Sequence, residues 1–369
     1  MRIGINLLPY KEITGWVIYI QNLLKELVRL SQNDKFFIFC SENLPLNLRL
    51  NEVKNTNLVV IRGLKGKHTK AFYQQFNIYP LLKKYKINLL FSPSPAAPIF
   101  YKNKVVVIHD CAYDQYPEFE NKLSKMYFRA MFYGAKYFSK KIITVSNFSK
   151  KELIELYKIS PDKIEVIYEG VPELPEVNEN FIQKTLAKFK IDKPYFFYIG
   201  NWRPRKNLLG LIKAFKIFRE KTNPDWLLII GGRKDKRFLD LEKEIEKNNL
   251  QGKVILTDAL SRKEISSLYK KAKSLTFSSF YEGFGLPILE AQSLGIPVLT
   301  SNISSLPEVA GNAAFYVNPY NIEEIAKGME KIAFDESLRQ NLIKKGFENI
   351  KRFSWEKAAK QLLNLFHSL

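Results

Sequence analysis

Cysteine is scarce in this sequence: Cys40 and Cys111 are the only two among 369 residues. Their spacing matches neither a metal site nor a redox pair, and a disulfide framework needs more cysteines than this. Cys40 ends an apolar run at 36–40 that is typical of a buried strand. We therefore expect a chain that folds without disulfide bonds in a reducing cytosol.

Long apolar runs are also missing. No uninterrupted apolar stretch approaches the ~20 residues that a membrane-spanning helix requires. The first six residues, Met-Arg-Ile-Gly-Ile-Asn, have the pattern of a strand rather than of a secretory signal. These features predict a cytoplasmic protein that does not cross a membrane.

Several motifs of nucleotide-dependent enzymes are absent. The sequence contains no Gly-x-x-x-x-Gly-Lys-Ser/Thr loop of the kind that ATPases and GTPases carry. No Gly-x-Gly-x-x-Gly follows the first predicted strand, which argues against a dinucleotide-dependent dehydrogenase. There is neither an Asp-x-Asp pair nor a His/Cys cluster to hold a metal ion. The sequence therefore predicts no metal site and no bound cofactor.

Acidic residues are missing from one part of a chain whose net charge is +21. Residues 54–104 contain ten Lys and Arg and no Asp or Glu. Such a field attracts nucleic acid, acidic lipid headgroups or phosphorylated substrates. The alternative is a lysine-rich composition spread over solvated surfaces. None of the usual nucleic-acid-binding modules is present, which leaves a basic nucleic-acid-binding protein as a remote alternative.

Short apolar runs alternate with helical periodicity along the whole chain, which predicts parallel βαβ units. In the first half we expect a helix at 16–30 and strands at 3–7, 36–40, 58–61, 88–91, 105–108, 142–145 and 164–167. In the second half we expect strands at 195–199, 227–230, 254–256, 274–277, 298–300 and 314–317.

The length suits two domains better than one core. We predict an α/β protein with two doubly wound, Rossmann-like domains that face each other across a cleft. Their bounds are 1–172 and 195–352, with a polar, proline-bearing linker at 173–194. Ligands of open parallel sheets bind at the carboxyl ends of the strands, so the functional loops should follow the strands.

The most informative loop follows the predicted strand 274–277. Gly283 and Gly285 allow close approach of a ligand to the backbone, and Pro287 then opens a helix. Amides at a helix N-terminus suit a phosphate. The carboxylates of Glu282 and Glu290 can accept hydrogen bonds from sugar or ribose hydroxyls. The alternative is that Glu290 only complements the helix dipole while Glu282 is solvated.

Two further loci follow predicted strands. Residues 200–207, Gly-Asn-Trp-Arg-Pro-Arg-Lys-Asn, place cations where they can hold a diphosphate and stabilise a departing nucleotide, unless they form a basic surface turn. His109 and Asp110 directly follow 105–108, where α/β folds place ligand contacts. Gly15, before the first helix, can let a ligand approach the backbone, or can simply close a loop.

Taken together, these segments resemble the GT-B-fold retaining glycosyltransferases of family four, often called glycosyl transferases group one. The most specific match is the Glu-x7-Glu pattern from Glu282 to Glu290 within EGFGLPILEAQSLGIPV. The other matches are VVVIHD (105–110), VSNFSKKEL (145–153), KIEVIYEGV (163–171), RPRKN (203–207), TSNISSLPEVAGNAAFYVNP (300–319) and FSWEKAAKQLL (353–363). They cover nearly the whole chain. The resemblance implies a GT-B fold whose last helix, within 353–369, packs back on the first domain.

The resemblance also implies roles for individual residues. Glu290 would bind the donor ribose, and Glu282 would bind hydroxyls of the transferred sugar. The implied contacts along the sugar and its phosphates are the amides of Gly283, Phe284, Gly285 and Leu286. Arg205 and Lys206 would neutralise the diphosphate, His109 would lie near the reacting carbon, and Gly15 would belong to the donor-side loop. Many members carry arginine where this chain has Asn201, so either Arg203 or Arg205 would supply that charge.

The implied reaction retains the anomeric configuration without a metal, and transfers a hexosyl group from a nucleotide-diphosphate sugar. The arginine–lysine subtype is similar to bacterial polysaccharide mannosyltransferases, so GDP-mannose is the first expectation, with UDP-hexoses and dTDP- or GDP-linked deoxysugars open. The acceptor would be a lipid-linked or polysaccharide glycan, as in lipopolysaccharide synthesis. An epimerase acting on nucleotide sugars, or a phosphorylase, is the alternative with the same fold.

A peripheral contact with an anionic membrane is the last expectation. Lys65, Lys67, Lys70, Lys83, Lys84 and Lys86 lie close in sequence to Phe72, Tyr73, Phe76 and Tyr79. Cations are attracted to an anionic leaflet, and aromatic rings settle at headgroup level. The alternative is that these aromatic side chains are core and the lysines ordinary surface.

Overall fold

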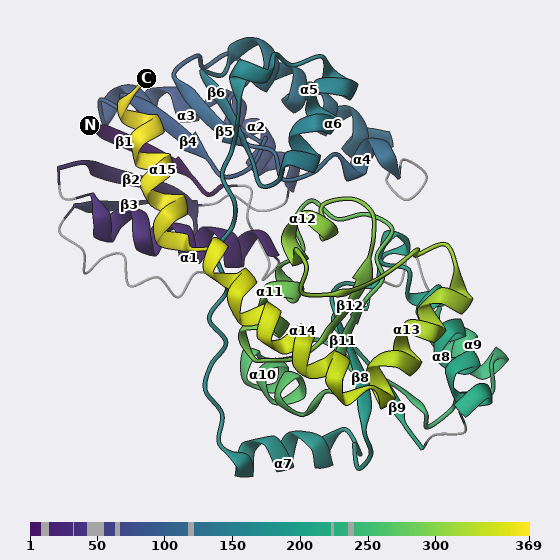
Figure 1. The fold of residues 1–369 in the computed structure, drawn as a ribbon. Helices are drawn as coiled ribbons and strands as arrows, with labels where there is room; N and C mark the ends of the chain where they lie inside the picture. The colour runs from purple at the N-terminus through teal and green to yellow at the C-terminus, as the bar shows by residue number, and fades with distance from the viewer. Residues whose placement is uncertain are drawn as a thin grey trace. The chain divides into compact units, whose positions relative to one another are not determined.

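The computed structural model describes residues 1–8, 15–31, 33–42, 55–62, 67–116, 122–222, 225–234 and 240–369. The chain forms two compact units. The first unit is Met1–Gly170 together with Phe353–Leu369, and the second unit is Val171–Arg352 (Figure 1). Among the described residues, no helix combines the length and the apolar character needed to cross a membrane.

The first unit is built on a seven-stranded parallel sheet with the strand order β3-β2-β1-β4-β5-β6-β7. Its strands are β1 (Arg2–Asn6), β2 (Lys35–Ser41), β3 (Thr56–Ile61), β4 (Leu89–Ser92), β5 (Lys104–Val107), β6 (Lys141–Thr144) and β7 (Ile164–Val166). β1, β2, β4 and β5 are almost entirely buried, because parallel strands are covered on both faces. All seven strands lie where the apolar runs predict them.

The helices of the first unit cover this sheet (Figure 1). They are α1 (Gly15–Leu30), α2 (Lys67–Phe76), α3 (Ile78–Lys84), α4 (Ala112–Gln115), α5 (Lys122–Phe138), α6 (Asn147–Tyr157) and α15 (Trp355–His367). The last helix, α15, packs on α1, as the resemblance implies. The ring centroids of Tyr19 and Trp355 are 5.9 Å apart, and His367 Nε2 lies 2.8 Å from the buried carboxylate of Asp34.

The second unit repeats the same plan. Its parallel sheet has the order β10-β9-β8-β11-β12-β13, with β8 (Tyr195–Ile199), β9 (Leu227–Gly231), β10 (Val254–Leu256), β11 (Ser274–Phe277), β12 (Val298–Ser301) and β13 (Phe315–Val317). Its helices are α7 (Glu179–Lys188), α8 (Leu208–Thr222), α9 (Leu241–Lys247), α10 (Arg262–Lys271), α11 (Leu286–Ser293), α12 (Leu306–Ala310), α13 (Ile322–Phe334) and α14 (Glu336–Asn349). The predicted class, two doubly wound parallel-sheet domains, is confirmed.

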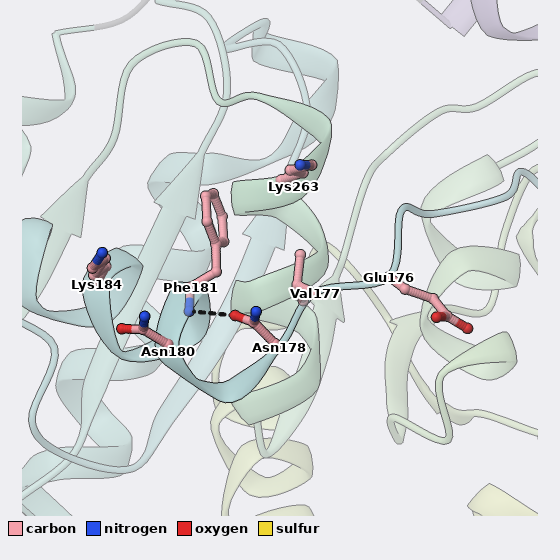
Figure 2. Close-up of a pocket in the computed structure, with 7 residues that line it drawn as sticks. All are labelled: Glu176, Val177, Asn178, Asn180, Phe181, Lys184 and Lys263. Atoms are coloured by element: carbon pink, nitrogen blue, oxygen red, sulfur yellow. Dashed lines mark hydrogen bonds between the residues drawn. The ribbon is translucent and has the colours of Figure 1, made fainter.

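The predicted linker at 173–194 is wrong. These residues belong to the second unit and contain α7, which packs on α10. The side chain of Asn178 caps α7 by accepting from the amide of Phe181, and Lys263 Nζ lies 5.9 Å from the centroid of the Phe181 ring (Figure 2). A surface pocket of about 250 Å³ lies between α7 and α10. Proline and polar residues indicated a boundary here, but the cap starts a helix immediately after them.

The strand order places the switch point of each sheet. In doubly wound sheets, ligands bind outside the carboxyl ends of the two neighbouring strands whose connections run in opposite directions. In the second unit these strands are β8 and β11, which pair in parallel. The loops after them are residues 200–207 and 278–285, which contain the acidic and basic residues singled out from the sequence.

Candidate active site in the second unit

Glu282 is the centre of a buried ionic cluster. Lys206 Nζ lies 2.5 Å from Glu282 Oε1, and Arg205 donates to Glu282 Oε2 at 3.3 Å. Ser279 donates from Oγ to Glu282 Oε1 at 2.8 Å. The structure therefore brings three of the predicted residues together, although Glu282 is 76 positions from Lys206 in the chain.

The cluster holds the carboxylate of Glu282 in its charged form. Burial raises the pKa of Glu282, but Lys206 and Arg205 lower it by more, so that the net pKa is below the ordinary value. The side chains of Lys206 and Glu282 are only 9% and 8% exposed. An ionised carboxylate accepts hydrogen bonds and donates none, which suits a ligand rich in hydroxyl groups.

Backbone contacts hold the two loops together. Phe280 donates its amide to the carbonyl of Arg205 at 2.8 Å, and Arg205 NH1 donates to the carbonyl of Tyr281 at 2.9 Å. Asn207 ends the short 3₁₀ turn Pro204–Lys206 with a φ of 57°. Its side-chain amide donates to the carbonyl oxygens of Ser278 and Pro319 at 3.1 and 2.8 Å. Both loops are therefore fixed before a ligand arrives.

The glycine-rich segment leads directly into α11. Gly285 has a φ of +117°, and a Cβ at this position would lie 3.0 Å from Leu306 Cδ2, so a larger residue would be strained. Ser305 fixes the loop by donating to the carbonyls of Glu282 and Phe284 at 2.8 and 2.9 Å. The first residue of α11 is Leu286, and the amino end of the helix therefore lies immediately beyond the glutamate cluster.

Glu290 lies on α11 but has different partners from Glu282. Arg262 donates to Glu290 Oε1 at 2.7 Å, and the hydroxyl of Tyr269 donates to Oε2 at 3.2 Å. Burial raises the pKa of Glu290, and Arg262 and Tyr269 only partly offset that effect. The side chain of Arg262 is 31% exposed. Glu290 is therefore a buried carboxyl whose charged form further hydrogen-bond donors would stabilise.

His109 lies in the first unit, after β5. Its Nε2 is 3.1 Å from the carbonyl of Pro93, and its Nδ1 is 3.5 Å from Glu169 Oε1. A carbonyl only accepts hydrogen bonds, so Nε2 carries a hydrogen. The ring stacks on that of Trp16, and the rings of Tyr19 and His109 are nearly perpendicular to each other. Both ring nitrogens thus face protein acceptors.

Gly15, the other candidate in the first unit, is the first residue of α1. No atom of the described residues lies within 4 Å of a Cβ built there. The role of Gly15 in ligand binding therefore stays a prediction. Residues 9–14, which precede it, lie outside the described part of the chain.

Several residues of these clusters escaped sequence reasoning. Arg262 and Tyr269, seven residues apart on α10, reach the same carboxylate from more than 20 positions away. Ser305 falls inside the matched segment 300–319, which was the available signal. Glu169 follows β7 within the matched segment 163–171, but the sequence pattern does not distinguish it from an exposed glutamate. Burial raises the pKa of Glu169, although His109 lowers it in part.

Comparisons with known proteins identify the family. Residues 181–349 match the family model described as glycosyl transferases group 1, and residues 13–173 match the model described as glycosyltransferase family 4. The O-antigen chain mannosyltransferase B of Escherichia coli is 30% identical over 293 residues, which cover 78% of this chain and 76% of the relative. This chain is a family 4 glycosyltransferase.

Two further similarities place the glycosyltransferase among its relatives. The O-antigen chain mannosyltransferase RfbU of Salmonella typhimurium is 33% identical over 218 residues, covering 59% of this chain and 57% of the relative. A crystal structure of Anabaena Alr3699/HepE in complex with UDP-glucose superposes with a TM-score of 0.78 at 16% identity, covering 100% of both chains. The second similarity shows the common fold.

Proposed function

We propose that this glycosyltransferase moves a hexosyl group from a nucleotide-diphosphate sugar to a hydroxyl of a glycan acceptor, with retention of the anomeric configuration. The observation that supports it best is the buried cluster of Glu282, Lys206 and Arg205 beside the amino end of α11. This cluster combines fixed cations for a diphosphate with a carboxylate for sugar hydroxyls, at the switch point of a doubly wound sheet.

In the proposed donor complex, each carboxylate contacts a different part of the donor. Glu282, kept ionised by its cations, accepts hydrogen bonds from hydroxyls of the transferred sugar. Glu290 accepts hydrogen bonds from the ribose, whose hydroxyl donors would favour its charged form.

The proposed chemistry depends on the leaving group. Negative charge grows on the diphosphate as its bond to the anomeric carbon breaks, and Lys206, Arg205 and the amides at the start of α11 are fixed where they can stabilise it. The acceptor hydroxyl attacks from the face that the diphosphate leaves, and its proton passes to an oxygen of the departing diphosphate. In this proposal the protein's own cations do the work that a divalent ion does at other diphosphate sites.

GDP-mannose is the proposed donor, because the relatives at 30% and 33% identity are named as O-antigen mannosyltransferases. Their names also support a glycan acceptor of the cell surface, lipid-linked or polymeric. HepE was crystallised with UDP-glucose, but at 16% identity it informs the fold and not the donor.

A thermal-shift screen tests the proposal. GDP-mannose, GDP, UDP-glucose and UDP would be compared at one common concentration; a ligand present at 100 times its dissociation constant stabilises by about 2.7 kcal/mol, and weaker ligands stabilise by less. We expect the largest shift with GDP-mannose and its loss in Lys206→Met. Lys213→Met, an exposed lysine of α8, is the matched control and should keep the shift. No shift with any nucleotide sugar would contradict the proposal. In a separate product assay, a free epimerised sugar without transfer would indicate the epimerase alternative.

A further inference from the structure

Helix α5 presents apolar side chains to solvent on a face where surface helices carry polar ones. Its inner face buries Met131, Phe132 and Ala135. On the outer face, Leu123 is 72% exposed, Met126 is 67% exposed and Tyr137 is 64% exposed, with the half-exposed Tyr133 between them. These positions follow one another by three, seven and four residues, which places them on a single stripe. A helix in contact with water alone would carry charged residues there.

The apolar surface continues beyond α5. Phe100 is 72% exposed, and its ring packs against that of Phe138 at the end of α5, with centroids 5.3 Å apart. Gln75 of α2 lies next to α5, with its Nε2 3.7 Å from Met131 Sδ. On the same helix Phe72 and Phe76 are each 62% exposed. We call Phe100 and the stripe of Leu123, Met126, Tyr133 and Tyr137 the α5 patch.

Positive charge accompanies the patch. Helix α5 contains Lys122, Lys125, Arg129 and Lys136 and no acidic residue. Arg129 is neutralised by Asp114 at 2.7 Å, and Lys136 Nζ lies 5.1 Å over the ring of Tyr137. Apolar and aromatic side chains mixed with lysines are typical of a helix that lies in a membrane interface.

The structure also places the basic stretch predicted from the sequence. Lys83, Lys84 and Lys86 are exposed at and just beyond the end of α3. Phe72 and Phe76 are exposed rather than core, whereas Tyr73 and Tyr79 are half-buried. Lys54 and Lys65 lie outside the described residues, as do the side chains of Lys67 and Lys70. The sequence could not single out α5, whose stripe lies beyond the acid-free stretch.

Three occupants could cover an exposed apolar patch: another protein, a second copy, or a lipid surface. A second copy would bring together two identical basic faces of a chain with a net charge of +21. An acidic bilayer offers negative charge and an apolar interior at once, and it matches the lysines and the apolar stripe together. With 17 residues, α5 would lie along about 25 Å of the surface without spanning it.

We propose that the α5 patch binds the headgroup region of an anionic phospholipid bilayer, with Leu123, Met126 and Tyr137 inserted among the acyl chains. The surface deepens the proposed function, because it would bring the enzyme to a lipid-linked acceptor. In this proposal the exposed side of α5 is the membrane contact. Lys83, Lys84 and Lys86 add positive charge.

Vesicle sedimentation tests the patch directly. Vesicles of phosphatidylcholine alone would be compared with vesicles containing phosphatidylglycerol as well. The triple variant Leu123→Ser, Met126→Ser, Tyr137→Ser should bind acidic vesicles at least about tenfold more weakly than the wild type, because each side chain buries apolar area in the bilayer. The matched control is Leu58→Ser with Val60→Ser, two exposed apolar residues on the edge strand β3 of the same unit, and it should bind as the wild type does.

A fluorescent label gives an independent readout. Cys40 and Cys111 are both buried, so a Met126→Cys variant can be labelled selectively with an environment-sensitive dye. Its emission should shift to the blue with acidic vesicles, and salt should reverse the shift. Equal binding by the triple variant, equal binding to neutral vesicles, an unshifted label, or a wild-type dimer that the triple variant breaks would each overturn the proposal. Nucleotide-sugar binding by the second unit is measured in parallel, so that failure here is distinguishable from failure of the proposed function.

Discussion

Replacing Glu282 should cost the second unit much of its stability, for an electrostatic reason. In Glu282→Gln, the ammonium of Lys206 keeps its position but loses the carboxylate 2.5 Å away, and only 9% of its side chain is exposed. Breaking a buried ion pair by removing one partner costs about 3–5 kcal/mol, because the other charge stays buried. We expect a value near 3 kcal/mol, because the glutamine amide oxygen can still accept a hydrogen bond from Lys206.

A double-mutant cycle measures this interaction. Urea unfolding of the wild type, Glu282→Gln, Lys206→Met and the double variant gives the coupling energy between the two side chains. The double variant should recover most of the loss, since it buries no unpaired charge, and we expect a coupling of about 2 kcal/mol or more. A coupling below about 0.5 kcal/mol would refute the argument.

The pH dependence supplies a second check with a defined sign. Burial raises the pKa of Glu282, but Lys206 and Arg205 outweigh burial and lower it overall. The stabilising contribution is therefore complete above the ordinary glutamate pKa of about 4.3 and disappears as the pH falls through the lower native value. Below pH ~4, the wild type should lose unfolding free energy more steeply than Glu282→Gln does.

Three further predictions concern the proposed donor site and His109. Glu290→Gln should weaken nucleotide binding by about 1.5–3 kcal/mol in calorimetry. Burial raises the pKa of Glu290, so the wild type should lose unfolding free energy as the pH rises from the ordinary glutamate pKa to the raised pKa, and the variant should not. Activity should survive EDTA and give a product with the donor's anomeric configuration by NMR, and a strict Mn²⁺ or Mg²⁺ requirement would contradict this. Glu169→Gln should change the pH profile of kcat while leaving KM for the donor unchanged, because Glu169 faces His109 Nδ1; an unaltered profile would show that Glu169 is structural.

Sequence reasoning succeeded where the signal is local. Parallel strands buried on both faces appear as short apolar runs. Their loops carry glycine, proline and charge, which made both loops of the proposed donor site visible. The pairing of Glu290 with Arg262 was not visible, because the two residues are 28 positions apart and no local pattern links them. Helix α7 was missed because two prolines precede its cap. The outer face of α5 was missed because periodicity reveals an apolar stripe without indicating which face is covered.

The return of α15 to the first unit has a consequence for folding during synthesis. The second unit is continuous in sequence and can fold as soon as it leaves the ribosome, whereas the first unit lacks α15 until Trp355–His367 has been made. At 5–20 residues per second, the ribosome needs about 10–40 s to make the chain from Val171 to Leu369. During that time the side of α1 that packs on α15 is uncovered. Gly170 also lacks its neighbour Trp355, whose backbone nitrogen would lie 2.3 Å from a Cβ at position 170. The half of the enzyme translated first is therefore completed last.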